Sequence, residues 1–270
     1  MSTAPAAPGD DSRTDPGGSG ASSDSGSSDG GRDGTSRGDG GGFGPGAALA
    51  GEAARFARLG WMRATSGNLS VVVGRDPLRI LVTASGLDKG ALTAADAVEV
   101  DDAGAPTHVG GAPTDAGGSP TDAGGTPTDA GGTRATGGAP RRPSAEAVLH
   151  ARLIGLTGAG AVVHLHTVAS VLAADRFPTG LVLRDHEMLK ALGRAADGDL
   201  VRLPVVANSQ DMAVLAGRVA AAWEPLTPAV LVARHGMYVW GADLLAARHR
   251  AEAVEWLCEW AVRTAERTIG

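Results

Sequence analysis

The stretch Ala161-Val162-Val163-His164-Leu165-His166-Thr167 is apolar apart from two histidines and a closing threonine. Such a short apolar run predicts a buried β-strand. Because the side chains of a strand alternate between its two faces, we expect His164 and His166 to point to the same side. Two imidazoles on one face can bind one metal ion.

A third histidine, His235, follows the apolar run 229–233 after one arginine and precedes Gly236. Three neutral histidine nitrogens with a fourth position open form the ligand set of a catalytic zinc site. The His-x-His pair alone is a weak motif, since buried histidines satisfied by hydrogen bonds are common, but His235 at a strand end strengthens the metal hypothesis. We expect the other histidines to lie in helices or loops without a role in the site: His108, His150, His186 and His249.

Two segments differ from the rest in composition. Residues 1–45 consist almost wholly of small and polar residues, which cannot bury enough apolar surface to offset the entropy of ordering, so a disordered tail is predicted. Residues 104–140 contain a seven-residue repeat that predicts a flexible low-complexity insertion in a surface loop. The domain expected to fold is 46–270, interrupted by this insertion.

The net charge and the cysteine content of the chain argue against a nucleic-acid-binding protein and against a disulfide-linked one. The formal net charge is −6 without a Lys/Arg cluster, so we expect no nucleic-acid partner. The single cysteine, Cys258, excludes disulfides within the chain and is compatible with a cytoplasmic location. Residues 153–174 lack charged side chains, but their glycines and histidines favour a turn, a strand and a helix over a membrane span. No nucleotide-binding glycine motif occurs.

Hydrophobic patterning predicts alternating helices and strands, hence an α/β fold. Helices are expected at 47–59, 168–174, 212–223 and 242–268, and strands at 69–73, 79–83, 98–100, 201–206 and 230–233. The glycine-containing turns at 65–68 and 84–86 can offer N–H groups and hydroxyls to an anion, although each alone is also explained as a plain turn. Ser144 is expected to cap a helix with Glu146 in its first turn, and such a helix start can also bind an anion.

Taken in order, several stretches resemble the class II aldolase/adducin family, and within it the branch that dehydrates 5-methylthioribulose 1-phosphate in methionine salvage. The resemblance covers essentially all of 46–103 and 141–270, and its motifs are specific when they occur together in this order. They lie at 64–70, 83–86, 88–90, 143–146, 164–166, 187–190, 208–211, 234–236 and 239–241.

The resemblance implies a layered α/β/α domain with a central mixed, mainly antiparallel sheet, assembled as a homotetramer with sites near subunit contacts. It also implies one zinc ion per subunit on His164, His166 and His235. A pocket for the phosphate of a sugar-phosphate substrate is implied at Gly67, Asn68, Ser85, Gly86 and Ser144.

The implied reaction removes the C3 proton of the ketose phosphate, with zinc stabilising the enediolate, and then expels the C4 hydroxyl as water. The product is 2,3-diketo-5-methylthiopentyl 1-phosphate. Glu187 matches the acid/base position of the dehydratases, whereas Glu146 matches the acid/base glutamate of the sugar-phosphate aldolases. The preferred interpretation makes Glu187 the acid/base and puts Glu146 near the metal or substrate.

Two other functions remain open at this point. One is a zinc-dependent aldolase of the fuculose-phosphate type, which Glu146 supports. The other is a non-catalytic adducin-like scaffold, against which the presence of three histidines and both glutamates argues.

Overall fold

The computed structural model describes residues 44–107 and 141–267. Apart from Gly44 and Pro45, the predicted tail lies outside these residues, and so does the repeat insertion from residue 108 to 140. The first residues assigned to the insertion do belong to the described part. There the Thr107 N–H donates to the Glu99 carbonyl at 3.0 Å, and Val100 pairs with Pro106, so the chain turns back on itself before residue 108.

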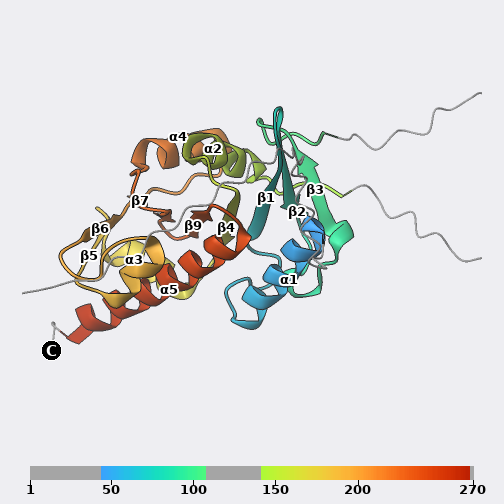
Figure 1. Cartoon of the computed structure of the whole chain (residues 1–270). Coiled ribbons are helices and arrows are strands. Elements are labelled where there is room, and N and C mark those ends of the chain that lie inside the picture. Colours follow the sequence, from blue (N-terminus) through green and yellow to red (C-terminus); the bar gives the residue numbers. More distant parts are fainter. Residues whose placement is uncertain (1–43, 108–140, 268–270) are drawn as a thin grey trace, which may run out of the picture. The chain divides into compact units, whose positions relative to one another are not determined.

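A seven-stranded sheet forms the centre of the described residues (Figure 1). Each neighbouring pair is antiparallel except β7 and β8, which are parallel, and this confirms the predicted mixed, mainly antiparallel sheet. In spatial order the strands are β3 (Ala97–Val100), β2 (Leu78–Thr83), β1 (Asn68–Arg75), β4 (Ala161–Leu165), β9 (Gly236–Gly241), β8 (Ala229–Val232) and β7 (Val205–Val206). A separate pair consists of β5 (Leu181–Arg184) and β6 (Leu200–Leu203).

Helices cover both faces of the sheet, which confirms the layered α/β/α architecture (Figure 1). One face packs against α2 (Ala147–Thr157) and α4 (Met212–Ala222). The other face packs against α1 (Pro45–Arg58), α3 (Val168–Arg176) and α5 (Leu244–Arg267). Three short 3₁₀ helices are described as well: η1 (Lys89–Ala91), η2 (Ala94–Asp96) and η3 (Glu187–Leu192).

The alternation of β4 explains why the histidine strand is central. Val163 and Leu165 enter the core under α1, α3 and α5, while Val162 enters the core under α2 and α4. Residues of a strand covered on both faces are apolar on both faces, which is the pattern that the sequence shows at 161–165. His164 therefore lies in a fully buried strand and is itself 0% exposed.

Two predicted elements were wrong in detail. The single strand expected at 201–206 is broken at Pro204, which cannot donate a backbone hydrogen bond, so β6 pairs with β5 whereas β7 pairs with β8. The helix expected to begin at Ser144 begins at Ala147, because the Ala147 N–H bonds to the Ser144 carbonyl at 3.0 Å in a preceding turn. Glu146 thus occupies the N-cap position of α2, and its side chain does not cap the helix.

None of the described helices combines the length and the apolar character that a membrane span requires.

The buried end of Glu255 on α5 leads to a pH-dependent prediction for stability. Burial, together with the nearby Glu259 charge, raises the pKa of Glu255 from 4.5 to about 7 despite a hydrogen bond from Thr167. Since the folded protein holds this proton more tightly than the unfolded chain, the free energy of unfolding should fall as the pH rises from 4.5 to about 7. Glu255→Gln removes the titrating group. The melting temperature of this variant relative to that of the wild type should therefore rise as the pH increases across this range.

The measurement is calorimetric melting of both proteins at several pH values. The surface variant Glu224→Gln, which breaks only the exposed ion pair with Arg202, serves as the control. A constant difference between Glu255→Gln and the wild type across this pH range would contradict the prediction.

Candidate metal centre and anion pocket

Three histidines meet where β4 ends and β9 begins. The Nε2 atoms of His164 and His166 are 2.8 Å apart, and the ring of His235 lies 4.8 Å from that of His164 and 4.7 Å from that of His166, measured between centroids. One ligand atom from each histidine lies within 4.8 Å of the other two. This convergence is the arrangement that the sequence analysis predicted, and it fits a single metal ion.

Backbone geometry brings His235 into this cluster. Arg234 has a φ of +56°, and the His235 N–H bonds to the Val232 carbonyl at 3.1 Å in a tight turn. The next residue must be glycine, since a Cβ at Gly236 would lie 2.1 Å from the carbonyl oxygen of Leu165. The missing side chain lets the start of β9 approach the end of β4, and this approach positions His235 beside His166.

Burial and hydrogen bonding prepare the histidines for metal binding. Nδ1 of His164 lies 3.0 Å from the Met237 carbonyl, which can only accept, so the proton is on Nδ1 and the Nε2 lone pair faces the cluster. Burial lowers the pKa of His164 to about 3 and that of His166 to about 4, and the nearby Glu146 carboxylate does not offset this effect. Both rings are therefore neutral at pH 7, the form that binds a metal ion.

Glu146 is the carboxylate that the structure brings to the histidines. Its Oε2 lies 3.3 Å from Nε2 of His164, and its Oε1 lies 3.3 Å from Nε2 of His235. The side-chain amide of Asn68 donates to Oε2 at 2.6 Å. Burial alone would raise the pKa of Glu146, but the histidine nitrogens and the Asn68 amide outweigh it and hold this pKa below the ordinary value. Glu146 is thus an ionised group placed to bind a metal or move a proton.

A cavity of about 320 Å³ opens next to the histidines. It is lined by all five residues expected to bind phosphate, namely Gly67, Asn68, Ser85, Gly86 and Ser144, together with Glu146, His166 and His235. Gly67 and Gly86 have φ values of +74° and +73°, which favour glycine in both turns. The structure therefore gathers the two glycine turns and the start of α2 around one space beside the candidate metal site.

Lys89 is a pocket residue that the sequence analysis did not single out. It is 1% exposed, and its Nζ donates to the carbonyls of Thr65 and Leu87, both at 2.9 Å, so it ties the two glycine turns together. Burial lowers its pKa. The signal was present, because Lys89 lies within the matching stretch 88–90, but nothing in that stretch indicated that the side chain would fold back between the turns.

Glu187 is not brought to the histidines within one chain. It begins η3, its side chain is 76% exposed, and its Oε1 accepts from Nζ of Lys190 at 2.6 Å. It is absent from the described residues that line the 320 Å³ cavity. Within one chain, Glu146 is therefore the carboxylate beside the histidine cluster.

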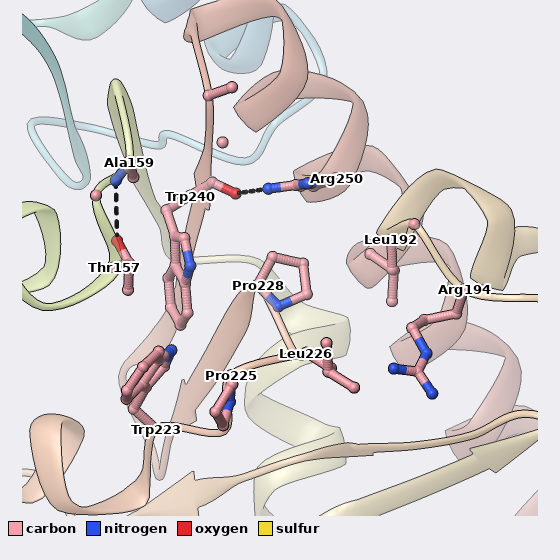
Figure 2. Close-up of a pocket in the computed structure, with 14 residues that line it drawn as sticks. Thr157, Ala159, Leu192, Arg194, Trp223, Pro225, Leu226, Pro228, Trp240 and Arg250 are labelled. Atoms are coloured by element: carbon pink, nitrogen blue, oxygen red, sulfur yellow. Dashed lines mark hydrogen bonds between the residues drawn. The ribbon is translucent and has the colours of Figure 1, made fainter.

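A second cavity, of about 400 Å³, is separate from the histidines (Figure 2). It lies between Trp223, Trp240 and the loop 225–228 on one side and Arg194 and Leu192 on the other, and Arg250 donates to the Trp240 carbonyl at 2.9 Å. Among its described lining residues, only the two arginines carry a charge, so it has no acid/base group for proton transfer. The cavity beside the histidine cluster is therefore the better candidate for an active site.

Comparison with known proteins agrees with this geometry. The profile described as "Class II Aldolase and Adducin N-terminal domain" matches residues 47–262. A methylthioribulose-1-phosphate dehydratase from Geobacillus kaustophilus is 35% identical over 217 residues, which is 80% of this chain and 90% of that protein. A protein of the same name from Persephonella marina is 32% identical over 203 residues, covering 74% of this chain and 81% of that one.

Solved structures show the same fold at lower identity. The L-fuculose-1-phosphate aldolase from Thermus thermophilus superposes with a TM-score of 0.57 at 23% identity, covering 83% of this chain and 96% of that one. YgbL from Escherichia coli, described as a putative aldolase/epimerase/decarboxylase, gives a TM-score of 0.58 at 20% identity. The match covers 79% of this chain and 86% of that one. With the profile match over most of its length, the chain belongs to the class II aldolase/adducin family.

Proposed function

We propose that this protein dehydrates 5-methylthioribulose 1-phosphate to 2,3-diketo-5-methylthiopentyl 1-phosphate, a step of methionine salvage. The observation that carries the proposal is a three-histidine cluster with Glu146 beside His164 and His235, opening on a cavity lined by two glycine turns and a buried lysine. Relatives at 32–35% identity over most of both chains carry the name of this dehydratase.

One zinc ion per subunit is the cofactor that fits best. The donor set is three imidazoles, which zinc favours, and the cavity lined by His166 and His235 would give a substrate access to a bound ion. When bound, zinc supplies a positive charge that stabilises negative charge developing on the C2 and C3 oxygens of the substrate.

The protein groups divide the remaining work between binding and proton transfer. The N–H groups and hydroxyls of the two glycine turns and Ser144, together with the Lys89 ammonium, suit the substrate phosphate. A carboxylate takes the proton from C3, and the C4 hydroxyl leaves as water after it gains a proton, so the net change is the loss of one water molecule. Glu146 supports the first of these steps, since it lies at the metal site.

Assembly explains how Glu187 can take part as the acid/base group. The described faces of α3 and α5 expose large apolar side chains, namely Val168, Leu172, Trp256 and Trp260. Such side chains favour contact with another protein surface, and a homotetramer is the assembly that we propose. A neighbouring subunit can then present its Glu187 to the histidine cavity, which the exposed position of this side chain permits. The buried single cysteine, Cys258, suits a cytoplasmic location.

A sugar-phosphate aldolase is the second candidate, and one observation favours it. Glu146 lies against His164 and His235, where an aldolase of the same family would use it as acid/base. The two reactions differ in proton flow, because cleavage of the C3–C4 bond requires loss of the C4 hydroxyl proton, whereas dehydration requires that hydroxyl to gain one. The reaction product therefore distinguishes them.

Mass spectrometry of the product tests the proposed function directly. The zinc-loaded protein should convert 5-methylthioribulose 1-phosphate into a compound lighter by one water, with the ultraviolet absorbance of a diketone. A three-carbon ketose phosphate would identify an aldolase instead. Absence of any reaction, with zinc bound, would contradict both enzymatic functions for this substrate and favour the scaffold.

The role of Lys89 is tested by phosphate binding, with no need for the true substrate. Lys89→Met removes a buried cation between the glycine turns, so the dissociation constant for inorganic phosphate should rise by about tenfold or more, as expected for a charge-assisted hydrogen bond. Titration calorimetry measures the constant, and Lys89→Arg, which keeps the charge, should lose less. The surface variant Arg79→Met is the control for general charge loss. Equal phosphate affinity in Lys89→Met and wild type would contradict the assignment.

Mixed oligomers test whether Glu187 acts across a subunit contact. Glu187→Gln should keep its zinc and its substrate affinity but lose turnover by about 10²–10⁴-fold, the usual contribution of a general acid/base. His166→Ala should lose zinc and turnover. Co-assembly of the two inactive variants should restore part of the activity, because some sites then combine intact histidines from one chain with Glu187 from the other.

Two results would count against this arrangement. Near-wild-type turnover in Glu187→Gln would leave Glu146 as the acid/base. Mixed oligomers without any recovered activity, in protein shown by light scattering to be co-assembled, would exclude the transfer of Glu187 between subunits.

A further inference from the structure

A row of polar side chains lies behind the histidine cluster, on the face of the sheet that α2 covers. Strand register puts Asn68, His164 and Tyr238 side by side on β1, β4 and β9. Ser70 follows on the same face of β1, and all four are buried. From α2, Glu146 and His150 face this row one helical turn apart. Polar groups at such depth require partners, or their burial costs stability.

Tyr238 lies against two residues of the candidate metal site, His164 and Glu146. Its ring is stacked on that of His164, with centroids 4.0 Å apart and planes inclined by 10°. Its hydroxyl is buried, and no described atom meets the distance and angle of a full hydrogen bond to it. Burial, the charge of the Glu146 carboxylate and a hydrogen-bonding contact with that carboxylate raise the pKa of Tyr238. Glu146 is the acceptor that this donor faces.

His150 does not fit the expectation that it has no role. It is 0% exposed, its Nδ1 lies 2.7 Å from the Ser70 hydroxyl, and its Nε2 has no partner among the described residues. Its ring meets that of Tyr238 edge-on, with centroids 6.0 Å apart. Burial lowers the pKa of His150 to about 4, so the ring is neutral and carries one proton. When the Ser70 hydroxyl donates to Nδ1, the ring proton lies on Nε2, the nitrogen without a partner among the described residues.

We propose that Ser70, His150 and Tyr238 form a buried hydrogen-bonded relay that positions the Glu146 carboxylate. Ser70 donates to Nδ1 of His150, Nε2–H of His150 donates to the Tyr238 oxygen through one buried water, and the Tyr238 hydroxyl donates to Glu146. Each donor thereby meets an acceptor, since the buried water accepts from His150 and Glu146 accepts from Tyr238, the two side chains whose polar atoms otherwise lack a partner among the described residues.

The relay supplies Glu146 with a second donor besides the Asn68 amide. The Asn68 amide donates to Oε2 of this carboxylate at 2.6 Å, and Nε2 of His235 lies 3.3 Å from Oε1. A donor from Tyr238 fixes its plane between His164 and His235, and stacking on His164 fixes that ring at the same time. Tyr238 is thus a positioning residue for the acid/base group and for a metal-binding histidine.

Tyr238 is the only tyrosine of the chain, and this permits a selective measurement. Protein produced with ring-deuterated tyrosine gives one isotope-edited infrared band for the phenol C–O stretch, which responds to the hydrogen bonds of the hydroxyl. In the zinc-loaded protein, Glu146→Gln and His150→Gln should each shift this band. Ser70→Ala is a second variant, which breaks the chain at its far end with little change in volume.

Val230→Ala provides the matched control, because Val230 pairs with Tyr238 across the strands and is apolar and buried. It should lower the melting temperature without moving the band. Tyr238→Phe keeps the ring on His164 but removes the hydroxyl, so it should retain zinc and lower kcat by about 10–100-fold with KM little changed, the usual effect of a group that supports metal-site residues.

The infrared test of the relay is independent of the proposed function. Only the expected fall in kcat of Tyr238→Phe rests on that function. The band does not depend on the substrate, so its shift in Glu146→Gln would support the relay even if dehydration of methylthioribulose 1-phosphate failed. A band that stays unchanged in both Glu146→Gln and His150→Gln would overturn the relay. Wild-type kcat in Tyr238→Phe would overturn its positioning role.

Discussion

The antiparallel pairing of β4 with β9 is the constraint on which the site depends. Its register sets Leu165 opposite Met237, and Gly236 approaches the Leu165 carbonyl more closely than any side chain would allow. His235 consequently lies beside His164 and His166, although about seventy residues separate them in sequence. The same pairing lets the Met237 carbonyl hold Nδ1 of His164, which turns Nε2 toward the other two rings.

Burial then determines the chemistry of the groups that this register gathers. The strand carrying His164 is covered on both faces, and the loss of hydration keeps His164 and His166 neutral and able to bind a metal ion. Glu146 stays ionised in the same environment because the Asn68 amide donates to its Oε2, while its Oε1 lies 3.3 Å from Nε2 of His235. Neutral nitrogens, a carboxylate and a buried ammonium from Lys89 therefore coexist around one cavity, a combination suited to a sugar phosphate and a metal ion.

Glu146 and Glu187 both lie in stretches that match the family, but the fold gives their side chains different surroundings. Glu146 precedes a buried helix that packs on the histidine face of the sheet, so its side chain points at the histidines. Glu187 begins a short 3₁₀ helix beside β5 and lies open to solvent near the exposed tryptophans of α5, as the contact of the preceding His186 with Trp260 indicates. A catalytic role for Glu187 would therefore require that a neighbouring chain bring it to the histidine cluster.

Local patterns in the sequence were enough to predict the strands, the helices, the three histidines and the two glycine turns, because alternation, apolar runs and glycine placement are short-range properties. They failed at Pro204 and at the start of α2, where a pairing partner and a turn decided the element boundaries. Lys89, Tyr238 and His150 were recognised as parts of the site only in the tertiary structure. Lys89 bonds to the carbonyls of Thr65 and Leu87, whereas Tyr238 and His150 meet through contacts between β1, β4, β9 and α2. No spacing along the chain encodes which buried polar atoms will face one another.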